Sequence, residues 1–258
     1  MRFKDKVVIV SGGGSIGQSM SIGRAASLGF AREGAMVVVV DRNLASAEET
    51  VEIIKDEQGE AIAVEANVLR EPDVRLMVEK TLSTCGKIDI LFNNVGCGWG
   101  TDIVNTSEEL WDRTYNVCVK SMFMVSKHVV PEMRKGGGGV VINNASTAAI
   151  VHDAMWAYNS AKAAVIKLTR DMACDYGREN IRVNCVVPGL IDTALGRLRV
   201  VDDQTAAEER RKLIQASVPL ARSGTPEEIA NAVLFLASAE ASYCNGSCLI
   251  VDGGFSCS

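Results

Sequence analysis

The sequence contains no hydrophobic run long enough to cross a membrane and no cluster of basic residues. Its longest apolar stretches, residues 7–10 and 35–40, are far shorter than the roughly 18 residues that a membrane helix needs. The 32 acidic residues outnumber the 27 basic ones, so the composition gives no electrostatic footprint for nucleic acid. The amino terminus also lacks the apolar core and cleavage site of a signal peptide. We therefore expect a cytoplasmic protein with neither a membrane nor a nucleic acid as partner.

Metal and disulfide chemistry have little support in the sequence. The eight cysteines form no C-x-x-C pair, and the only histidines are His128 and His152, so we expect no metal site. A disulfide framework is typical of short secreted chains, and this chain is long and has no signal peptide. We expect reduced, mostly buried thiols that pack as small hydrophobic side chains.

Short runs rich in valine and isoleucine alternate with longer segments of helical periodicity. This alternation is typical of βαβ units around a parallel sheet. The sequence shows no repeat and no linker, and the glycine run at residues 136–139 predicts a flexible turn before a strand. We expect one α/β domain over residues 1–258, a Rossmann-type doubly wound parallel sheet with helices on both faces. The seven expected strands cover residues 7–11, 36–41, 61–66, 88–93, 140–145, 181–187 and 247–251.

Local signals place several helix ends. The first helix should begin near Ser21 and end at Gly34, because glycine readily takes the left-handed conformation that ends a helix. Another helix should follow Thr225, where a capping hydroxyl, a proline and two early acids agree.

A glycine-rich turn, residues 12–23, follows the first expected strand. In such a turn, free N–H groups and the positive end of the next helix can meet a pyrophosphate. The second strand ends in Asp41, whose carboxylate can accept hydrogen bonds from an adenosine ribose and repel a 2′-phosphate. These features indicate NAD as the cofactor. Two alternatives stay open: Asp41 could cap the helix that starts near Leu44, and Arg42 could neutralise a 2′-phosphate.

Tyr158 and Lys162 lie four residues apart in a helical pattern that continues to about Tyr176. This spacing puts both side chains on one helix face, where the ammonium can stabilise a phenolate. The pair can therefore exchange a proton with an alcohol. Ser146 lies at the carboxyl end of an expected strand, the edge where open α/β sheets bind ligands. Its hydroxyl could hold a substrate oxygen, and the alternative role is an ordinary turn cap.

These features together resemble the classical short-chain dehydrogenases/reductases (SDR) along essentially the whole chain. Each motif is weak alone, but their order and spacing are specific. The segments that correspond to the family's motifs are the glycine turn, Asn93-Asn94-Val95-Gly96, Asn116 in a long helix, Ser146, Tyr158-x-x-x-Lys162, Pro188-Gly189-Leu190-Ile191-Asp192-Thr193 and Val251-Asp252-Gly253-Gly254.

The resemblance implies roles for individual residues. Tyr158 would be the general acid/base, Lys162 would stabilise its phenolate and hold the nicotinamide ribose, and Ser146 would anchor the substrate oxygen. Asn116 would hold a water in the proton relay. The carboxy-terminal strand would meet a neighbouring subunit of a homotetramer. The residues expected along the cofactor are Gly12, Ser15, Gly17, Ile22, Asp41, Asn67, Val68, Asn94, Gly96, Pro188, Gly189, Ile191 and Thr193, with Tyr158 and Lys162.

Two features depart from the family's pattern, and a third distinguishes this chain from the family's enoyl-reductase branch. The segment from Gly12 to Gly23 is longer than the family's T-G-x-x-x-G-x-G, and we prefer this longer register to one that ends at Gly17, because the sequence after Gly23 resembles the family's first helix. Asn67 stands where many members have an aspartate facing the adenine, and its amide oxygen can still accept that bond. Val165 stands where the enoyl-reductase branch places its lysine, which favours carbonyl chemistry.

The substrate pocket of the family is built by residues 190–217 and by nearby side chains. Those side chains are Cys97, Trp99, His152, Met155 and Trp156. Their sulfur and aromatic groups suggest an apolar or cyclic secondary alcohol, although they could equally be core or lid packing. Arg197 and Arg199 could bind an anionic substrate, or could simply be solvated.

We therefore expect an NAD-dependent enzyme that interconverts a secondary alcohol and a ketone, in the oxidative direction because cellular NAD is mainly oxidised. One alternative is an NADP-dependent 3-oxoacyl-type reductase, which Asp41 opposes. The other is a catalytically silent dinucleotide-binding regulator on the same fold. The set of Asn116, Ser146, Tyr158 and Lys162 opposes that second alternative.

Overall fold

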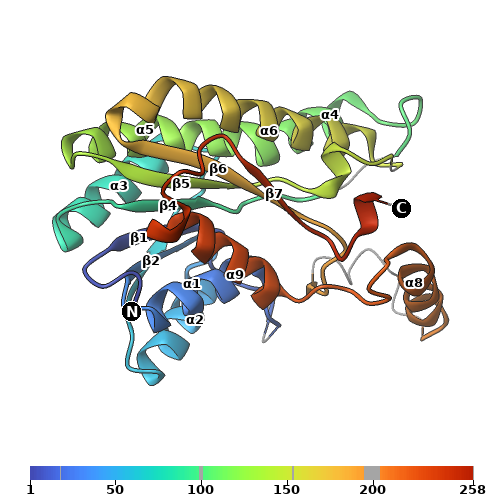
Figure 1. The fold of residues 1–258 in the computed structure, drawn as a ribbon, viewed down its shortest axis with the longest axis horizontal. Helices are drawn as coiled ribbons and strands as arrows, with labels where there is room; N and C mark the ends of the chain where they lie inside the picture. The colour runs from blue at the N-terminus through green and yellow to red at the C-terminus, as the bar shows by residue number, and fades with distance from the viewer. Residues whose placement is uncertain (18, 99–100, 153, 195–203, 258) are drawn as a thin grey trace.

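Seven parallel strands form one sheet at the centre of the molecule. The computed structural model describes residues 1–17, 19–98, 101–152, 154–194 and 204–257. The strand order is β3-β2-β1-β4-β5-β6-β7 (Figure 1). Every predicted strand is present, with its ends within two residues of those predicted. The strands are β1 (Val7–Ser11), β2 (Met36–Asp41), β3 (Glu60–Glu65), β4 (Ile90–Asn93), β5 (Gly139–Asn144), β6 (Ile181–Pro188) and β7 (Cys248–Val251).

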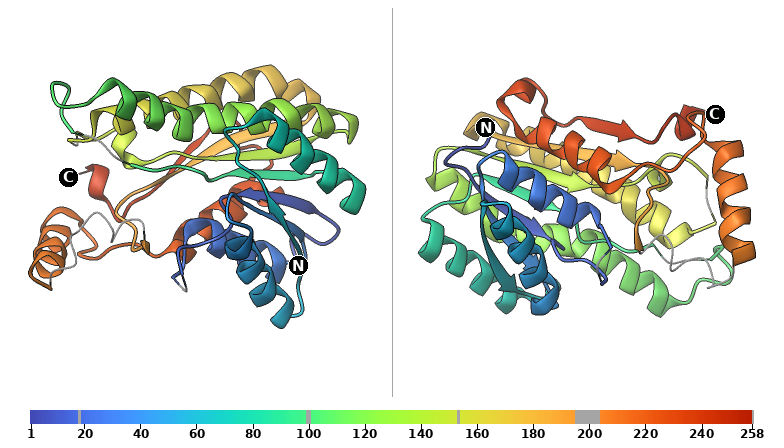
Figure 2. Two further views of the ribbon diagram at one scale, coloured as in Figure 1. Left: turned by 180° about the vertical axis from the view of Figure 1, so that it is seen from behind. Right: turned by 90° about the horizontal axis from the view of Figure 1, so that it is seen from below.

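Helices cover both faces of the sheet, as predicted for a doubly wound fold. One face carries α1 (Ile22–Arg32), α2 (Leu44–Asp56) and α9 (Pro226–Ala237). The other carries α3 (Glu71–Cys85), α5 (Ser121–Lys135) and α6 (Trp156–Tyr176) (Figures 1 and 2). Two further helices, α4 (Glu108–Tyr115) and α8 (Gln204–Ser217), lie toward one end of the sheet. Each face has its own hydrophobic core, because strands covered on both sides bury consecutive apolar side chains.

The helix ends follow their capping signals. The side chain of Ser21 accepts a hydrogen bond from the Arg24 N–H and so caps α1, and Gly34, at φ +89°, follows that helix. The glycine run ends α5 and leads into β5, with Gly137 and Gly138 both at positive φ. The predicted ends of the first helix and the predicted turn before β5 are therefore confirmed.

The connections of β1 create the crevice in which such sheets bind ligands. β1 pairs with β2 on one side and with β4 on the other, so the chain winds in opposite directions from this point. Ser11 pairs with Asn93, and Asn93 with Asn143, so polar residues come together at the carboxyl ends of three neighbouring strands. Ligands of doubly wound sheets bind outside this edge.

The cysteines are all free thiols, but they are less uniformly buried than we expected. Cys97, Cys118 and Cys185 are buried, Cys174 and Cys257 are exposed, and the other three are partly buried. Cys174 lies on α6 and Cys257 near the carboxyl terminus. No helix in the described part of the chain has the length and apolar character needed to cross a membrane.

The amino end of α9 provides a test of local stability. Thr225 Oγ1 accepts a hydrogen bond from the Glu228 N–H, while Glu228 Oε2 accepts one from the Thr225 N–H, which makes a capping box. Thr225→Ala removes one of these acceptors, so we expect the free energy of unfolding to fall by about 1 kcal/mol in urea titrations. Thr225→Ser keeps the hydroxyl and should retain most of the stability. Equal losses in the two variants would contradict this role of the cap.

Candidate active site

The glycine-rich turn brings the end of β1 against the start of α1. Gly12 has φ +70°, and the N–H groups of Gly12 and Gly13 both donate to the Val40 carbonyl. A Cβ on Gly23 would lie only 1.9 Å from the Gly12 carbonyl oxygen, so no other residue fits at that position. Because α1 begins at Ile22, the structure has the longer of the two registers considered from the sequence.

Hydrogen bonds from the protein itself hold the expanded part of this turn. Ser21 Oγ donates to the Gly14 carbonyl, and Ser46 Oγ accepts from the Ser15 N–H and donates to the Ser15 carbonyl. The turn is therefore fastened both to the start of α1 and to the first turn of α2.

A buried arginine, which sequence reasoning missed, supports the same turn from behind. The Arg24 side chain is 2% exposed and forms an ion pair with Glu49 at 2.5 Å. Its guanidinium also donates to Thr50 Oγ1 and to the carbonyls of Gly17 and Ser19. The one sequence signal was a charged residue on the face of α1 that packs against the sheet. These bonds fix the turn where a pyrophosphate would approach it.

Asp41 lies at the carboxyl end of β2, beside the turn. Its Oδ2 accepts a hydrogen bond from the Gly14 N–H at 3.2 Å, and its Oδ1 accepts one from the Asn43 N–H at 3.1 Å. The residue that caps α2 is Asn43, so the alternative in which Asp41 caps this helix is wrong. Arg42 is exposed to solvent.

The expected adenine side lies after β3. Asn67 Oδ1 accepts a hydrogen bond from the Leu69 N–H at 3.1 Å, which fixes a turn. A carbonyl oxygen has two lone pairs, so this bond leaves one for an adenine amino group. Val68 is buried in the core and holds the turn in place.

Three hydrogen bonds, which we call the amide relay, join the turn to α6. Asn94 Nδ2 donates to the Gly12 carbonyl, and Asn144 Nδ2 donates to Asn94 Oδ1, each at 2.9 Å. The Lys162 ammonium then donates to the Asn144 carbonyl at 2.6 Å. The relay links the residues that follow β1 and β4, and the last residue of β5, with α6. Asn144 was not predicted from the sequence.

Lys162 and Tyr158 lie on one face of α6, as their spacing predicted. The Lys162 side chain is 2% exposed, and its ammonium lies 5.6 Å from the centroid of the Tyr158 ring. A Cβ on Gly96 would come within 3.0 Å of the same ammonium, so this glycine leaves room for the lysine. The buried ammonium and the tyrosine ring therefore lie side by side on one face of the helix.

Ser146 lies two residues after β5 and caps a short 3-10 segment, Thr147–Ala149, that packs against α6. Its Oγ accepts a hydrogen bond from the Ala148 N–H at 3.2 Å, so Ser146 is a turn cap. A hydroxyl can accept one bond and donate another, and this cap is compatible with the predicted contact to a substrate oxygen.

Asn116 begins a π-helical turn, η1 (Asn116–Lys120), between α4 and α5. The Ser121 N–H donates to the Asn116 carbonyl, which makes the wide turn, and η1 packs against α6. The prediction of a long helix at Asn116 is confirmed, but the π turn was not anticipated. Such turns often occur at functional sites, because they change the direction of the groups around them.

The segment after β6 is held by backbone hydrogen bonds. The Gly189 N–H donates to the Val251 carbonyl, and Ile191 forms a bridge with Gly224. Pro188 ends β6, and Thr193 lies two residues beyond Ile191. These contacts position the stretch that the resemblance assigns to the nicotinamide.

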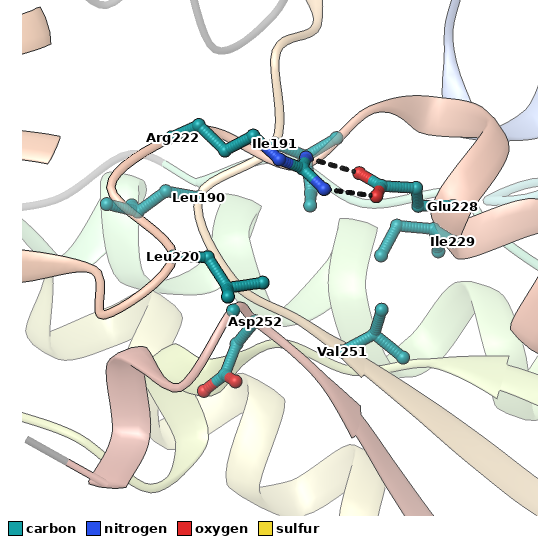
Figure 3. Close-up of a pocket in the computed structure, with 10 residues that line it drawn as sticks. Leu190, Ile191, Leu220, Arg222, Glu228, Ile229, Val251 and Asp252 are labelled. Carbon is teal, nitrogen blue, oxygen red and sulfur yellow. Dashed lines mark hydrogen bonds and ion pairs between the residues drawn. The ribbon is translucent and has the colours of Figure 1, made fainter. Parts of the chain in front are cut away.

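Beside this segment lies a small cavity of about 110 Å³ (Figure 3). At its rim the Arg222 guanidinium binds both carboxylate oxygens of Glu228, and this bond lowers the pKa of Glu228 to about 2. A cavity of this size is smaller than typical ligand sites, so it is not the crevice for a dinucleotide. Its walls are Leu190, Ile191, Leu220, Arg222, Gly224, Glu228, Ile229, Val251, Asp252 and Gly253.

The predicted substrate residues fall into two groups. His152 and Trp156 are exposed and make an edge-to-face contact at 6.5 Å, and the Trp156 N–H donates to the Thr101 carbonyl. Cys97 is instead buried and takes a hydrogen bond from Cys118 through its carbonyl. The thiol contact with Cys118, together with burial, raises the pKa of Cys97. Trp99, Arg197 and Arg199 lie outside the described residues.

The residues at this edge fit a dinucleotide. Glycines stand at positions 12, 13 and 14 of the turn, a carboxylate lies at the end of β2, and the Lys162 ammonium contacts the end of β5. The N–H groups of Gly12, Gly13, Gly14 and Ser15 are used within the protein, so the first N–H groups of α1, which begins at Ile22, are the ones that can meet a phosphate. The polar side chains can meet two riboses. Within the described part of the chain, no three metal-ligating side chains gather at one point.

Known proteins match the chain along almost its whole length. A family model described as enoyl-(acyl carrier protein) reductase matches residues 16–256. An uncharacterized oxidoreductase of Thermotoga maritima is 40% identical over 98% of this chain and 98% of its own length. The 3-oxoacyl-[acyl-carrier-protein] reductase FabG of the same organism is 36% identical over 98% of this chain and 99% of its own length.

A solved structure has the same fold as this chain. It is a 7α-hydroxysteroid dehydrogenase in complex with NADH and 7-oxo glycochenodeoxycholic acid. The sequence identity is 36% and the TM-score is 0.90, with 98% of this chain and 95% of that chain covered.

The close approach at Gly23 gives a test of the site. Gly23→Ala places a methyl group against the Gly12 carbonyl, so we expect α1 and the turn to move apart. Affinity for NADH, measured by fluorescence titration, should fall at least roughly tenfold, together with the melting temperature. The control is Gly136→Ala, whose Cβ would meet its nearest atoms at 3.5 Å. If Gly23→Ala bound NADH like the original protein, this account of the turn would be wrong.

Proposed function

The chain belongs to the short-chain dehydrogenase/reductase family, and we propose that this oxidoreductase uses NAD to interconvert a secondary alcohol and a ketone by hydride transfer. The observation that carries the proposal is the amide relay, which brings the glycine-rich turn and the Lys162 ammonium to one edge of the sheet. Tyr158 lies beside that ammonium on the same helix. A dinucleotide and a proton-transfer group would thus meet at one place.

Bound NAD would supply the acceptor for the hydride that leaves the carbinol carbon. The residues of the chain would position the substrate against the cofactor and provide a path for the proton. Tyr158, as the phenolate, accepts the alcohol proton, and its hydroxyl returns that proton in the opposite direction. Ser146 Oγ donates a hydrogen bond to the substrate oxygen, and Asn116 holds a water that connects the site to solvent.

Lys162 is the residue on which this chemistry depends most. Its ammonium is buried, and the only partner oxygen that we find for it in the described part of the chain is the Asn144 carbonyl. An ammonium has three N–H donors, so two can be directed to ribose hydroxyls. A buried cation also stabilises a neighbouring anion strongly, which supports the phenolate form of Tyr158.

Asp41 supports the choice of NAD over NADP. Its carboxylate is held at the end of β2 by the Gly14 and Asn43 N–H groups, so it cannot easily turn away from a 2′-phosphate. A phosphate there would meet a like charge. The 7α-hydroxysteroid dehydrogenase relative, which is solved with NADH, agrees with this choice.

A second candidate function is an NADP-dependent 3-oxoacyl reductase. The observation that favours it is the 36% identity to the FabG reductase. Asp41 opposes it for the reason given above. Reduction of a carbon–carbon double bond, which the description of the matching family suggests, is less well supported, because position 165 is Val165 and not a lysine.

The substrate that we propose is an apolar or cyclic alcohol, oxidised in the physiological direction. The exposed rings of His152 and Trp156, which meet edge to face, offer a partly apolar surface after β5. The 7-oxo steroid in the related structure is a cyclic ketone, in line with such a surface. We assign the substrate-side loop to residues 190–217, of which 195–203 lie outside the described residues.

We further propose that the protein is a cytoplasmic homotetramer, by analogy with the family. Exposed apolar side chains on α5 and β7 support association, because Phe123 and Ile250 are 50% and 45% exposed. A hollow of about 410 Å³ lies between β7 and α6, near Ile150 and Ile166. Apolar surfaces of this kind are suited to contacts between subunits.

The proton path is tested by removing one oxygen atom. Tyr158→Phe keeps the ring but cannot exchange a proton, so turnover of secondary alcohols should fall roughly 10²- to 10⁴-fold. Binding of NADH, followed by fluorescence, should stay close to the original value. Near-normal turnover in this variant would rule out Tyr158 as the acid/base group.

Cofactor choice is tested by removing one charge. We expect the protein to prefer NAD, and Asp41→Ala should shift the ratio of kcat/KM toward NADP by about tenfold, because the repulsion of the 2′-phosphate is lost. Glu65→Ala, which removes an exposed carboxylate at the end of the neighbouring strand β3, is the control and should leave the ratio unchanged. A preference for NADPH in the unaltered protein would favour the reductase alternative.

A further inference from the structure

The side chain of Asn144 is only partly satisfied by the protein. The residue ends β5 and is 8% exposed. Its Nδ2 donates to Asn94 Oδ1, but its Oδ1 is buried and has no hydrogen-bond partner among the described residues. A buried acceptor without a partner is costly, and such groups are rare unless a ligand or water completes them.

The orientation of this amide is fixed by its neighbours. The Gly12 carbonyl can only accept a hydrogen bond, so the nitrogen of Asn94 must face it. The oxygen of Asn94 then faces Asn144, and the nitrogen of Asn144 must face that oxygen. Exchange of the two amide atoms of Asn144 would break the relay, so Oδ1 is the atom left over.

The position of Asn144 relates this oxygen to Lys162. Side chains alternate along a strand, so Asn143 and Asn144 lie on opposite faces of β5. Asn143 donates to Thr169 on α6, within the core, whereas Asn144 bonds Asn94 beside the glycine-rich turn. The Asn144 carbonyl also accepts the bond from the Lys162 ammonium. The unpartnered oxygen thus belongs to the residue that holds the predicted ribose-binding lysine.

A second buried oxygen without a partner, Asn93 Oδ1, has a different setting. Asn93 is 1% exposed, and its nitrogen donates to Ser126 on α5 and to Asn143. It therefore lies in the core between the sheet and the helices, on the face opposite Asn144. This contrast makes Asn93 a matched control for the loss of a buried amide.

We propose that Asn144 is a further cofactor-binding residue, whose Oδ1 accepts a hydrogen bond from a hydroxyl of the nicotinamide-side ribose. The inference rests on the proposed use of a nicotinamide dinucleotide. A ribose hydroxyl can accept one hydrogen bond and donate another. Lys162 supplies the donor and Asn144 the acceptor, so the two residues together satisfy one hydroxyl in both directions.

Three ligands separate this contact from the rest of the site. NADH and ADP-ribose contain the nicotinamide-side ribose, whereas ADP lacks it. In Asn144→Ala, the Kd measured by calorimetry should rise roughly 3- to 10-fold for NADH and for ADP-ribose and stay unchanged for ADP, because one neutral hydrogen bond is lost. Asp41→Ala should instead weaken all three ligands, since each contains the adenosine ribose. Asn93→Ala should change none of the affinity ratios.

The fold of the variants is checked by circular dichroism. If Asn144→Ala does not fold, Asn144→Leu carries the test, because it has a similar volume and removes the unsatisfied oxygen. The role of Asn144 would be overturned if the affinity for all three ligands stayed unchanged. It would also be overturned if NADH, ADP-ribose and ADP lost affinity equally, and in either case water would be the partner of this oxygen. Failure of the unaltered protein to bind NADH would instead contradict the proposed function.

Discussion

The amide relay from the Gly12 carbonyl through Asn94 and Asn144 to the Lys162 ammonium is the interaction on which the site depends. The strands before it are apolar and covered on both faces, so a polar group that follows them is either paired or costly. Each amide in the relay satisfies the next. As a result, a turn, two strand ends and a helix are held in register.

Close packing of the backbone adds a second constraint at the same edge. Gly23 lets α1 approach the end of β1, and Gly96 leaves space for the lysine. The turn between β1 and α1 is longer than in the family's pattern, and a longer turn could be expected to weaken this packing. Arg24 compensates, because it occupies the space behind the turn and satisfies two of its carbonyls. The expanded turn, which departs from the family's pattern, is therefore stabilised by Arg24.

The features that could be predicted from the sequence are those that local pattern determines. Strands such as Val7–Ser11 are continuous apolar runs because both faces are buried, and Tyr158 and Lys162 share a face through helical spacing alone. Asn144 and Arg24 could not be recognised in this way, since their partners come from distant segments. The π turn at Asn116 is made by a local hydrogen bond within one continuous helical stretch, so the helical pattern did not reveal it. Burial of the thiols was overestimated because Cys174 lies on the outer side of α6, which composition does not reveal.

The strand order has a consequence for how the molecule folds. β1 is the first strand in the chain but lies inside the sheet, and its partner β4 begins at Ile90. The relay joins positions 12, 94, 144 and 162, so most of the chain must be closed into loops before the edge is complete. Parallel sheets with such distant pairings fold slowly, and the early strands stay exposed in the meantime. During synthesis, the relay at the carboxyl end of β1 therefore cannot form until the ribosome has added Lys162, about 150 residues later.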